Sequence, residues 1–337
     1  MSEVEGSAVV VYGATGHTGR FVVEELLRRG ITPVVSGRDG ARLKEMWGGL
    51  WVRPATVDDP DSLDRALAGA VAVINAAGPF AVTAGPVLEA AVRAGIPYLD
   101  VAAEIEANVG TFEAAREARV PVVPAMAFYG GLGDLLVTAA MGDWTAADEV
   151  HVAYGLSSWH PTPGTRVAGE VSHDRRGGRR VRFTGGELEY HDEKPSEEDW
   201  AFPEPLGKRA VVAGFTMADV VTVPSHLEVA EVQTYMSVEA ARDLASVDTP
   251  APSVDSSGRS DQTFVVDVLV RAGGVERRAS ATGQDIYAVT APLVVEAVQR
   301  ILDGRFRRAG IASAGAMFDA ADFLQSLAPH IMVELGH

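Results

Sequence analysis

Three glycines stand at intervals of three residues near the start of the chain, at Gly13, Gly16 and Gly19. They separate an apolar run from an amphipathic run, as expected where a strand turns into a helix. The first glycine allows a tight turn, the second lets backbone amides approach a pyrophosphate, and the third lets helix and strand pack closely. Free N–H groups at the helix start then face the anion. The pattern predicts dinucleotide binding by Gly13, Ala14, Thr15, Gly16, His17, Thr18 and Gly19.

The residues after the second apolar run indicate which dinucleotide binds. NAD enzymes usually carry an acid there, which holds the ribose 2′-hydroxyl. Here the run ends in Ser36, Gly37 and Arg38, and an arginine can face a 2′-phosphate, so the sequence favours NADP. Asp39 keeps NAD open, unless it caps the next helix. Asp58 is expected near the adenine edge, or else as a helix cap.

Polar side chains follow the later strands, where a substrate would meet the cofactor. The loops after these strands contain Asp100, Glu104, Tyr129 and Asp134. Reduction of a C=N or C=O bond needs a proton donor near the accepting atom, and Tyr129 is the first candidate, followed by Glu104 and Asp100. Each has a structural alternative: Asp134 as a helix cap, Asp100 as an acceptor for backbone amides, and Tyr129 as a pocket wall. An iminium substrate could also supply its own proton.

These loops must be positioned by a regular alternation of strands and helices over the first 125 residues. Strands that are apolar on both sides and alternate with helices form a parallel sheet covered on both faces. The sequence therefore predicts a doubly wound Rossmann sheet of six strands, at residues 8–12, 32–36, 50–57, 71–75, 98–101 and 121–123.

The pattern changes after about residue 148. Short strands are expected at 150–155, 166–170, 179–183, 209–215 and 263–270, with exposed connections at 187–200 and 246–260 and helices at 290–302 and 318–327. The predicted fold class is therefore α/β, with an inserted mixed or antiparallel α+β domain.

Composition excludes several classes of function. A formal net charge of −17 argues against nucleic acid and anionic membranes as partners, and no apolar run approaches the roughly 20 residues of a membrane-spanning helix. The absence of cysteine excludes a thiol nucleophile. No metal is expected, because His160, His173 and His226 are too far apart in the sequence. The N-terminus does not resemble a signal peptide, so a cytoplasmic location is expected.

Two further patterns have less specific interpretations. Tyr190 and Lys194 have the Tyr-x-x-x-Lys spacing of short-chain dehydrogenases, but Pro195 and acidic neighbours disfavour the helix that this motif requires. Arginines at 175, 176, 179 and 180 flank a Gly-Gly pair. Such a run is usually a solvated face, and binding of a carboxylate or phosphate of the substrate is the alternative.

Segments 73–80 (VINAAGPF), 94–104 (AGIPYLDVAAE) and 124–134 (PAMAFYGGLGD), with GATGHTGR and SGRD before them, resemble the saccharopine dehydrogenase-like reductases. The resemblance implies a Rossmann NADP-binding domain at 1–125 plus 286–337 and a substrate-binding and dimerisation domain at 126–285. It also implies hydride transfer from NADPH and a homodimer. The loop after the fourth strand adds the expected cofactor contacts Ala76, Gly78, Pro79 and Phe80.

The sequence thus predicts an NADPH-dependent reductase of a small-molecule substrate, in which an imine, a ketone or a conjugated C=C bond of a metabolic or natural-product intermediate is reduced. Two alternatives stay open. One is an NAD-dependent dehydrogenase of an amino-acid-derived substrate, and the other is a sensor or structural subunit that binds NADP without turnover.

Overall fold

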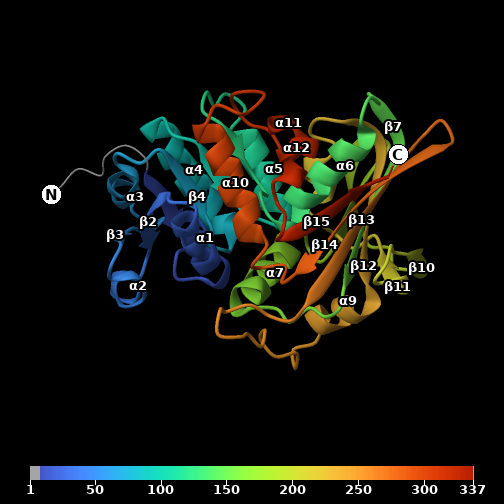
Figure 1. Ribbon diagram of the computed structural model, residues 1–337, viewed down its shortest axis with the longest axis horizontal. Coiled ribbons are helices and arrows are strands. Elements are labelled where there is room, and N and C mark those ends of the chain that lie inside the picture. The colour runs from blue at the N-terminus through green and yellow to red at the C-terminus, as the bar shows by residue number, and fades with distance from the viewer. Residues whose placement is uncertain (1–7, 337) are drawn as a thin grey trace.

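The computed structural model describes residues 8–336, and two β-sheets organise it (Figure 1). The first sheet is parallel and has the strand order β3-β2-β1-β4-β5-β6. This is the predicted doubly wound arrangement, in which the strand order reverses between β1 and β4. Its strands are β1 (Ala8–Tyr12), β2 (Thr32–Gly37), β3 (Trp51–Pro54), β4 (Ala72–Asn75), β5 (Tyr98–Asp100) and β6 (Val122–Val123).

The first sheet has a hydrophobic core on each face, which explains why its central strands are largely apolar. Val9 and Val11 of β1 pack in one cluster with Leu26, whereas Val10 packs in the opposite cluster with Leu63. The helices that follow the first five strands are α1 (His17–Arg28), α2 (Gly40–Trp47), α3 (Pro60–Leu67), α4 (Phe80–Ala94) and α5 (Ile105–Ala114).

The second sheet is mixed and has nine strands in the described part of the chain, as the predicted fold class requires. Its main path is β10-β11-β12-β7-β13-β14-β15, and β8 pairs with β12 and β9. The β12–β7 pair is parallel and the other pairs are antiparallel. The strands are β7 (Ala146–Leu156), β8 (Arg180–Thr184), β9 (Glu187–His191), β10 (Glu197–Ala201), β11 (Lys208–Ala213), β12 (Glu228–Ser237), β13 (Thr263–Ala272), β14 (Val275–Gln284) and β15 (Ile331–Leu335).

One hydrophobic cluster joins the two sheets, running from Val9 of the first sheet through Leu293 to Val152 of the second. The remaining helices connect or cover the sheets. They are α6 (Gly133–Met141), α7 (Pro163–Arg175), α8 (Asp219–Thr222), α9 (Val238–Ala245), α10 (Thr290–Leu302), α11 (Ala314–Met317) and α12 (Ala320–Gln325), with a kinked turn at Phe128–Leu132 before α6.

Two local predictions in the second half were wrong. Residues 166–170 belong to helix α7 and not to a strand, because Thr162 caps the helix by accepting from Thr165 N at 3.1 Å and Pro163 occupies its first turn. Residues 187–200 contain β9 and β10 and are not one exposed loop. Their side chains are largely polar, so pairing with β8 and β11 determines the strands.

The C-terminal segment contacts both sheets. Helix α10 packs against α1, as a return to the Rossmann domain requires. Strand β15, however, pairs with β14 from Gly283↔Ile331 to Ala279↔Leu335. The assignment of residues 331–335 to the first domain is therefore wrong, because the free edge of β14 takes up the last strand.

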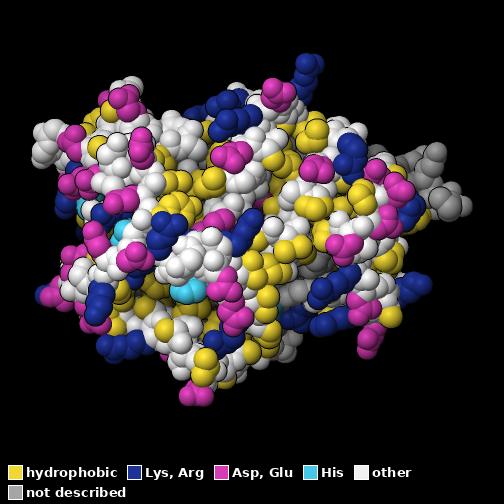
Figure 2. All heavy atoms as spheres, turned by 180° about the vertical axis from the view of Figure 1, so that it is seen from behind, with side chains coloured by type: hydrophobic (Ala, Val, Ile, Leu, Met, Phe, Trp, Pro, Cys, Tyr) yellow, Lys and Arg dark blue, Asp and Glu magenta, His cyan; other side chains and the backbone are white. Residues whose placement is uncertain are grey.

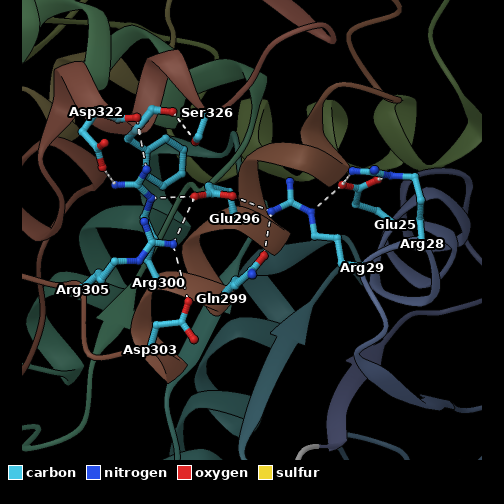
Figure 3. Close-up of polar contacts among 11 residues, drawn as sticks. Glu25, Arg28, Arg29, Glu296, Gln299, Arg300, Asp303, Arg305, Asp322 and Ser326 are labelled. Atoms are coloured by element: carbon cyan, nitrogen blue, oxygen red, sulfur yellow. Dashed lines mark hydrogen bonds and ion pairs between the residues drawn. The ribbon is translucent and has the colours of Figure 1, made fainter.

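A chain of ion pairs connects α1, α10 and α12 (Figure 3). Arg29 Nε donates to Glu25 at 2.7 Å, and its Nη1 donates to Glu296 at 2.5 Å. Glu296 also accepts from Arg300 Nε at 2.7 Å, and Arg300 Nη1 donates to Asp322 at 2.6 Å. Arg300 is almost fully buried, at 2% exposure. The network therefore fixes the C-terminal helices against the first helix of the chain.

We expect Glu296→Ala to lower the free energy of unfolding by about 2–3 kcal/mol, because it leaves buried guanidinium groups short of an acceptor. The loss stays moderate because Arg29 keeps Glu25 and Arg300 keeps Asp322. Urea unfolding monitored by circular dichroism measures the change. Glu24→Ala, on the exposed side of α1, is the control; equal stability of the two variants would contradict a role for the network.

Acidic and basic side chains are interspersed over the rear face, and hydrophobic side chains gather around a hollow in the lower middle of that view (Figure 2). Within residues 8–336, no helix combines the length and the apolar character that crossing a membrane requires. The same residues contain no group of three or more His, Cys, Asp or Glu side chains that could hold a metal ion.

Candidate functional site

A cleft of about 2190 Å³ lies at the carboxyl ends of the parallel strands. The loops after β1, β2, β4 and β5 form one wall, and helices α7 and α9 contribute to the other. Ligands of open α/β sheets bind in this position, at the point where the strand order reverses. Twelve of the fifteen predicted cofactor residues line the cleft, namely Gly13, Thr15, Gly16, His17, Thr18, Gly37, Arg38, Asp58, Ala76, Gly78, Pro79 and Phe80.

The glycine loop has the geometry that a pyrophosphate requires. Gly13 has φ +93°, and a Cβ on it would lie 2.8 Å from the Ala76 carbonyl carbon. A Cβ on Gly19 would overlap the Gly13 carbonyl oxygen, so this glycine permits close helix–strand contact. Helix α1 begins after Gly16 without a side-chain cap and without an acid in its first turn. Its first amides are therefore free to bind an anion, and the loop fits a dinucleotide.

Three predicted cofactor residues lie outside the cleft lining. Ser36 is fully buried, and its carbonyl oxygen accepts from Gly13 N at 2.9 Å and Ala14 N at 3.2 Å. The Ala14 carbonyl accepts from Trp47 Nε1 at 3.0 Å. Ser36, Ala14 and Gly19 thus shape the glycine loop from behind and are not part of the cleft lining. These three residues are excluded from the cleft lining because they pack closely behind the loop.

The groups after β2 distinguish between the two alternatives for Asp39. Its carboxylate accepts from Ala41 N at 3.1 Å and Arg42 N at 3.0 Å, so it caps α2. Arg38 and Arg42 line the cleft, and Arg38 forms no ion pair within residues 8–336. Asp58 lines the cleft as well, while its neighbour Asp59 caps α3. The cleft wall after β2 thus carries the guanidinium of Arg38 without an ion-pair partner among residues 8–336.

Asp100 lies beneath the cleft and not in its lining. Its fully buried carboxylate accepts from the Tyr98 hydroxyl at 2.9 Å, Ala102 N at 3.0 Å and Ala125 N at 2.8 Å. Burial raises its pKa, although these hydrogen bonds act in the opposite direction. The structure therefore does not bring Asp100 to the position of a proton donor. It holds the loops after β5 and β6 together.

Glu104 lines the cleft but is engaged by the backbone. Its two carboxylate oxygens accept from Phe80 N at 2.8 Å and Ala81 N at 3.0 Å, the first amides of α4. Burial raises the pKa of Glu104, and the hydrogen bonds from these two amides offset only part of that rise. Glu104 thus caps a helix beside the cleft, a role that the sequence-based proton-donor hypothesis missed.

Tyr129 lies in the wall of the cleft, on the turn before α6. Its ring stacks on Trp159 with centroids 5.1 Å apart and contacts Tyr154 at 5.0 Å. The residue is 7% exposed, and its hydroxyl has no hydrogen-bond partner in the described part of the protein. Burial raises its pKa well above 10, so the hydroxyl keeps its proton at neutral pH. Tyr129 is the one sequence candidate with a free proton to donate.

Two buried carboxylates behind Tyr129 have other roles. Asp219, which sequence reasoning missed, accepts from the Tyr154 hydroxyl at 2.8 and 3.0 Å, and burial raises its pKa to about 7. Asp134 accepts from Gly315 N at 2.6 Å and contacts His226 Nε2 at 2.8 Å. Asp134 thus joins distant segments and is not the cap of α6. No local sequence signal indicates such long-range partners.

The second wall of the cleft contains residues that the sequence did not indicate. The Tyr287 hydroxyl lies 3.0 Å from Thr165 Oγ1 and accepts from Trp159 Nε1 at 3.3 Å. The Tyr287 ring also contacts the His17 ring edge-on at 5.2 Å, which joins α7 to the glycine loop. Tyr190 lies in strand β9 and not in the cleft lining, so the Tyr-x-x-x-Lys match is not part of this site.

Comparisons with known proteins agree with this geometry. Residues 13–132 match a family model described as NAD(P)H-binding. A 116-residue segment is 32% identical to a probable mitochondrial saccharopine dehydrogenase-like oxidoreductase of Arabidopsis thaliana, covering 29% of this chain and 26% of that protein. A saccharopine dehydrogenase-like oxidoreductase of Homo sapiens is 29% identical over 117 residues, which cover 28% of this chain and 27% of that protein. The matches thus span about a quarter of these relatives.

Among solved structures, apo saccharopine dehydrogenase (L-Glu forming) from Saccharomyces cerevisiae superposes with a TM-score of 0.65 at 14% identity. The superposition covers 98% of this chain and 100% of the yeast chain, so it extends the likeness in fold to the second sheet. A segment of about 116 residues is therefore related in sequence to the saccharopine dehydrogenase-like oxidoreductases, and the whole chain has the fold of saccharopine dehydrogenase, in line with the resemblance of the sequence motifs.

Proposed function

We propose that the protein is an NADPH-dependent reductase of a small-molecule substrate. The observation that carries the proposal is that the uncapped start of α1, the unpaired Arg38 and the protonated Tyr129 all line one cleft. The start of α1 would bind the pyrophosphate and Arg38 the 2′-phosphate. Tyr129 would act as the proton donor. A homodimer and a cytoplasmic location stay predictions.

The preference for NADPH over NADH rests on the groups after β2. An enzyme that selects NAD needs a free carboxylate at the ribose hydroxyls. The carboxylate of Asp39 is already engaged by two amides of α2, whereas the guanidinium of Arg38 has no acidic partner among residues 8–336. A bound 2′-phosphate would give Arg38 a charge-assisted hydrogen bond.

The chemistry divides between the cofactor and the chain. NADPH, when bound, supplies a hydride to the carbon of an imine, ketone or conjugated C=C bond. The Tyr129 hydroxyl would donate a hydrogen bond to the substrate's oxygen or nitrogen and transfer its proton as negative charge develops there. The aromatic rings around Tyr129 limit the access of water, which strengthens this electrostatic effect.

We expect Arg38→Ala to weaken NADPH binding about 10- to 100-fold, since a hydrogen bond to a charged group contributes about 1.5–3 kcal/mol. NADH lacks the 2′-phosphate, so its affinity should hardly change. Titration of the protein's fluorescence with each nucleotide measures both dissociation constants. Arg93→Ala, which removes an exposed arginine of α4 outside the cleft lining, is the control. Equal weakening of both nucleotides by Arg38→Ala would contradict the assignment.

A further inference from the structure

We propose that Arg176 and Arg180, assisted by Arg179, bind a carboxylate or phosphate group of the substrate, whose apolar, reducible part then lies against Phe215 and Trp159 beside Tyr129. All six residues line the cleft. The inference rests on the proposed function and specifies its substrate class as an anion with an apolar conjugated body.

The three arginines carry more positive charge than their surroundings neutralise. Among residues 8–336, Glu106 is the one carboxylate within 4.0 Å of any of them, at 4.0 Å from Arg176 Nη1. Arg180 donates to the carbonyl oxygens of Ala213 and Gly214, and Arg179 lies over the Tyr190 ring at 5.3 Å. Two positive charges are therefore unpaired at this wall, in a protein whose formal net charge is −17.

Arg176 and Arg180 are also partly removed from water. Arg176 is 18% exposed, and its buried Nε has no hydrogen-bond partner in the part of the chain that the structure describes. Burial and the neighbouring charge of Arg176 lower the pKa of Arg180, which nevertheless stays protonated as a guanidinium. A bound oxyanion would accept hydrogen bonds from the two guanidinium groups and offset the repulsion between the two side chains.

The cofactor's own phosphates lie elsewhere. Helix α7, in the lower middle of Figure 1, starts beside Tyr287 and the glycine loop, passes Gly78 at Ala168, and reaches α5 where Ser172 Oγ donates to Glu106 at 2.7 Å. Its C-terminal end therefore lies on the β5 side of the sheet. Arg38 follows β2, three strand spacings away in the strand order, which corresponds to roughly 14 Å. Arginines at the β5 side are thus not needed for a 2′-phosphate or a pyrophosphate.

A continuous wall connects the arginines to Tyr129. Arg180 Nε donates to the Gly214 carbonyl at 3.1 Å, and the next residue, Phe215, contacts the Trp159 ring at 6.4 Å. Trp159 in turn stacks on Tyr129. A substrate anchored at the arginines would therefore extend along aromatic surface to Tyr129, which favours an apolar body. Glu170 and Asp174 also line the cleft from α7, but both are exposed and neither pairs with the arginines.

The test uses the full chain saturated with NADP⁺ and follows its tryptophan fluorescence. The probes are cinnamate, neutral cinnamamide and inorganic phosphate. We expect cinnamate to bind at least about tenfold more tightly than cinnamamide. In the double variant Arg176→Gln/Arg180→Gln, the affinity for cinnamate should fall at least about tenfold. Arg175→Gln is the matched control, because Arg175 is the last residue of α7, directly precedes Arg176, is exposed and does not line the cleft. NADPH affinity should stay unchanged in both variants.

The outcomes separate the anion site from the proposed function. Competition by phosphate would identify a phosphate-bearing substrate, and binding of cinnamate without such competition would identify a carboxylate; both results support the site. Normal NADPH binding with cinnamate and cinnamamide bound equally, or neither bound, would overturn the anion site alone. An equal loss in Arg175→Gln would overturn it as well. Failure to bind NADPH at all would instead refute the function on which the inference rests.

Discussion

Replacement of Gly16 by valine should weaken the binding of both NADPH and NADH by at least about a hundredfold. A Cβ at this position would lie 3.2 Å from the Gly13 carbonyl oxygen, and the two methyl groups would project from the uncapped start of α1. Two or more charge-assisted hydrogen bonds to the pyrophosphate would then be lost, at about 1.5–3 kcal/mol each. The effect differs from that of Arg38→Ala because both nucleotides share the pyrophosphate.

Isothermal titration calorimetry with each nucleotide measures this loss, and circular dichroism establishes that the variant is folded. Gly49→Val is the control, since a Cβ on Gly49 meets nothing within 4 Å. Retained affinity in a folded Gly16→Val variant would mean that the loop is a plain structural turn. A matched substitution at Gly19 is less informative, because its Cβ would overlap the Gly13 carbonyl and disturb the fold itself.

The second large effect is expected for Tyr129→Phe, which should lower the turnover number about 10²- to 10⁴-fold and leave NADPH affinity unchanged. The phenyl ring preserves the stacking on Trp159 and removes only the unpartnered hydroxyl. Loss of the proton donor would act on the transition state, so kcat should fall more than KM rises. The measurement is NADPH oxidation, followed by absorbance, with imines, ketones and conjugated enals.

Tyr190→Phe is the matched control for this prediction. Tyr190 lies in β9 outside the cleft lining and is the tyrosine of the Tyr-x-x-x-Lys match. Its variant should retain full activity. Unchanged turnover in Tyr129→Phe would leave Tyr129 as a pocket wall, and a loss confined to Tyr190→Phe would restore the short-chain dehydrogenase alternative.

Local patterns determined the first domain. Apolar runs with glycine, proline and acidic punctuation predicted all six parallel strands, because both core clusters need an apolar side chain at almost every strand position. The spacing of Gly13, Gly16 and Gly19 predicted the loop because the local backbone leaves no room for side chains. A turn with φ +93° and a helix in contact with a strand both exclude side chains, so the residue type itself carries the information.

The tertiary structure alone decided which polar groups are free to act. From the sequence, Tyr129 was the first candidate, followed by Glu104 and Asp100. In the structure Asp100 accepts three hydrogen bonds and Glu104 caps α4, whereas the buried Tyr129 hydroxyl has no partner among residues 8–336. Likewise, the amides of α2 engage Asp39 and leave Arg38 free. These outcomes depend on partners brought together by folding, many of them distant in the chain.

The second domain shows the same division. Its series of short expected strands indicated a mixed or antiparallel sheet, and a mixed sheet is present. The helix at 163–175 and the strands at 187–201 were not predicted, since their apolar periodicity is weak and neighbouring elements complete them. What the residues determined by themselves is the nucleotide loop and the class of fold. What only folding decided is the far wall of the cleft, because contacts between distant residues bring Arg176, Arg179 and Arg180 into its lining.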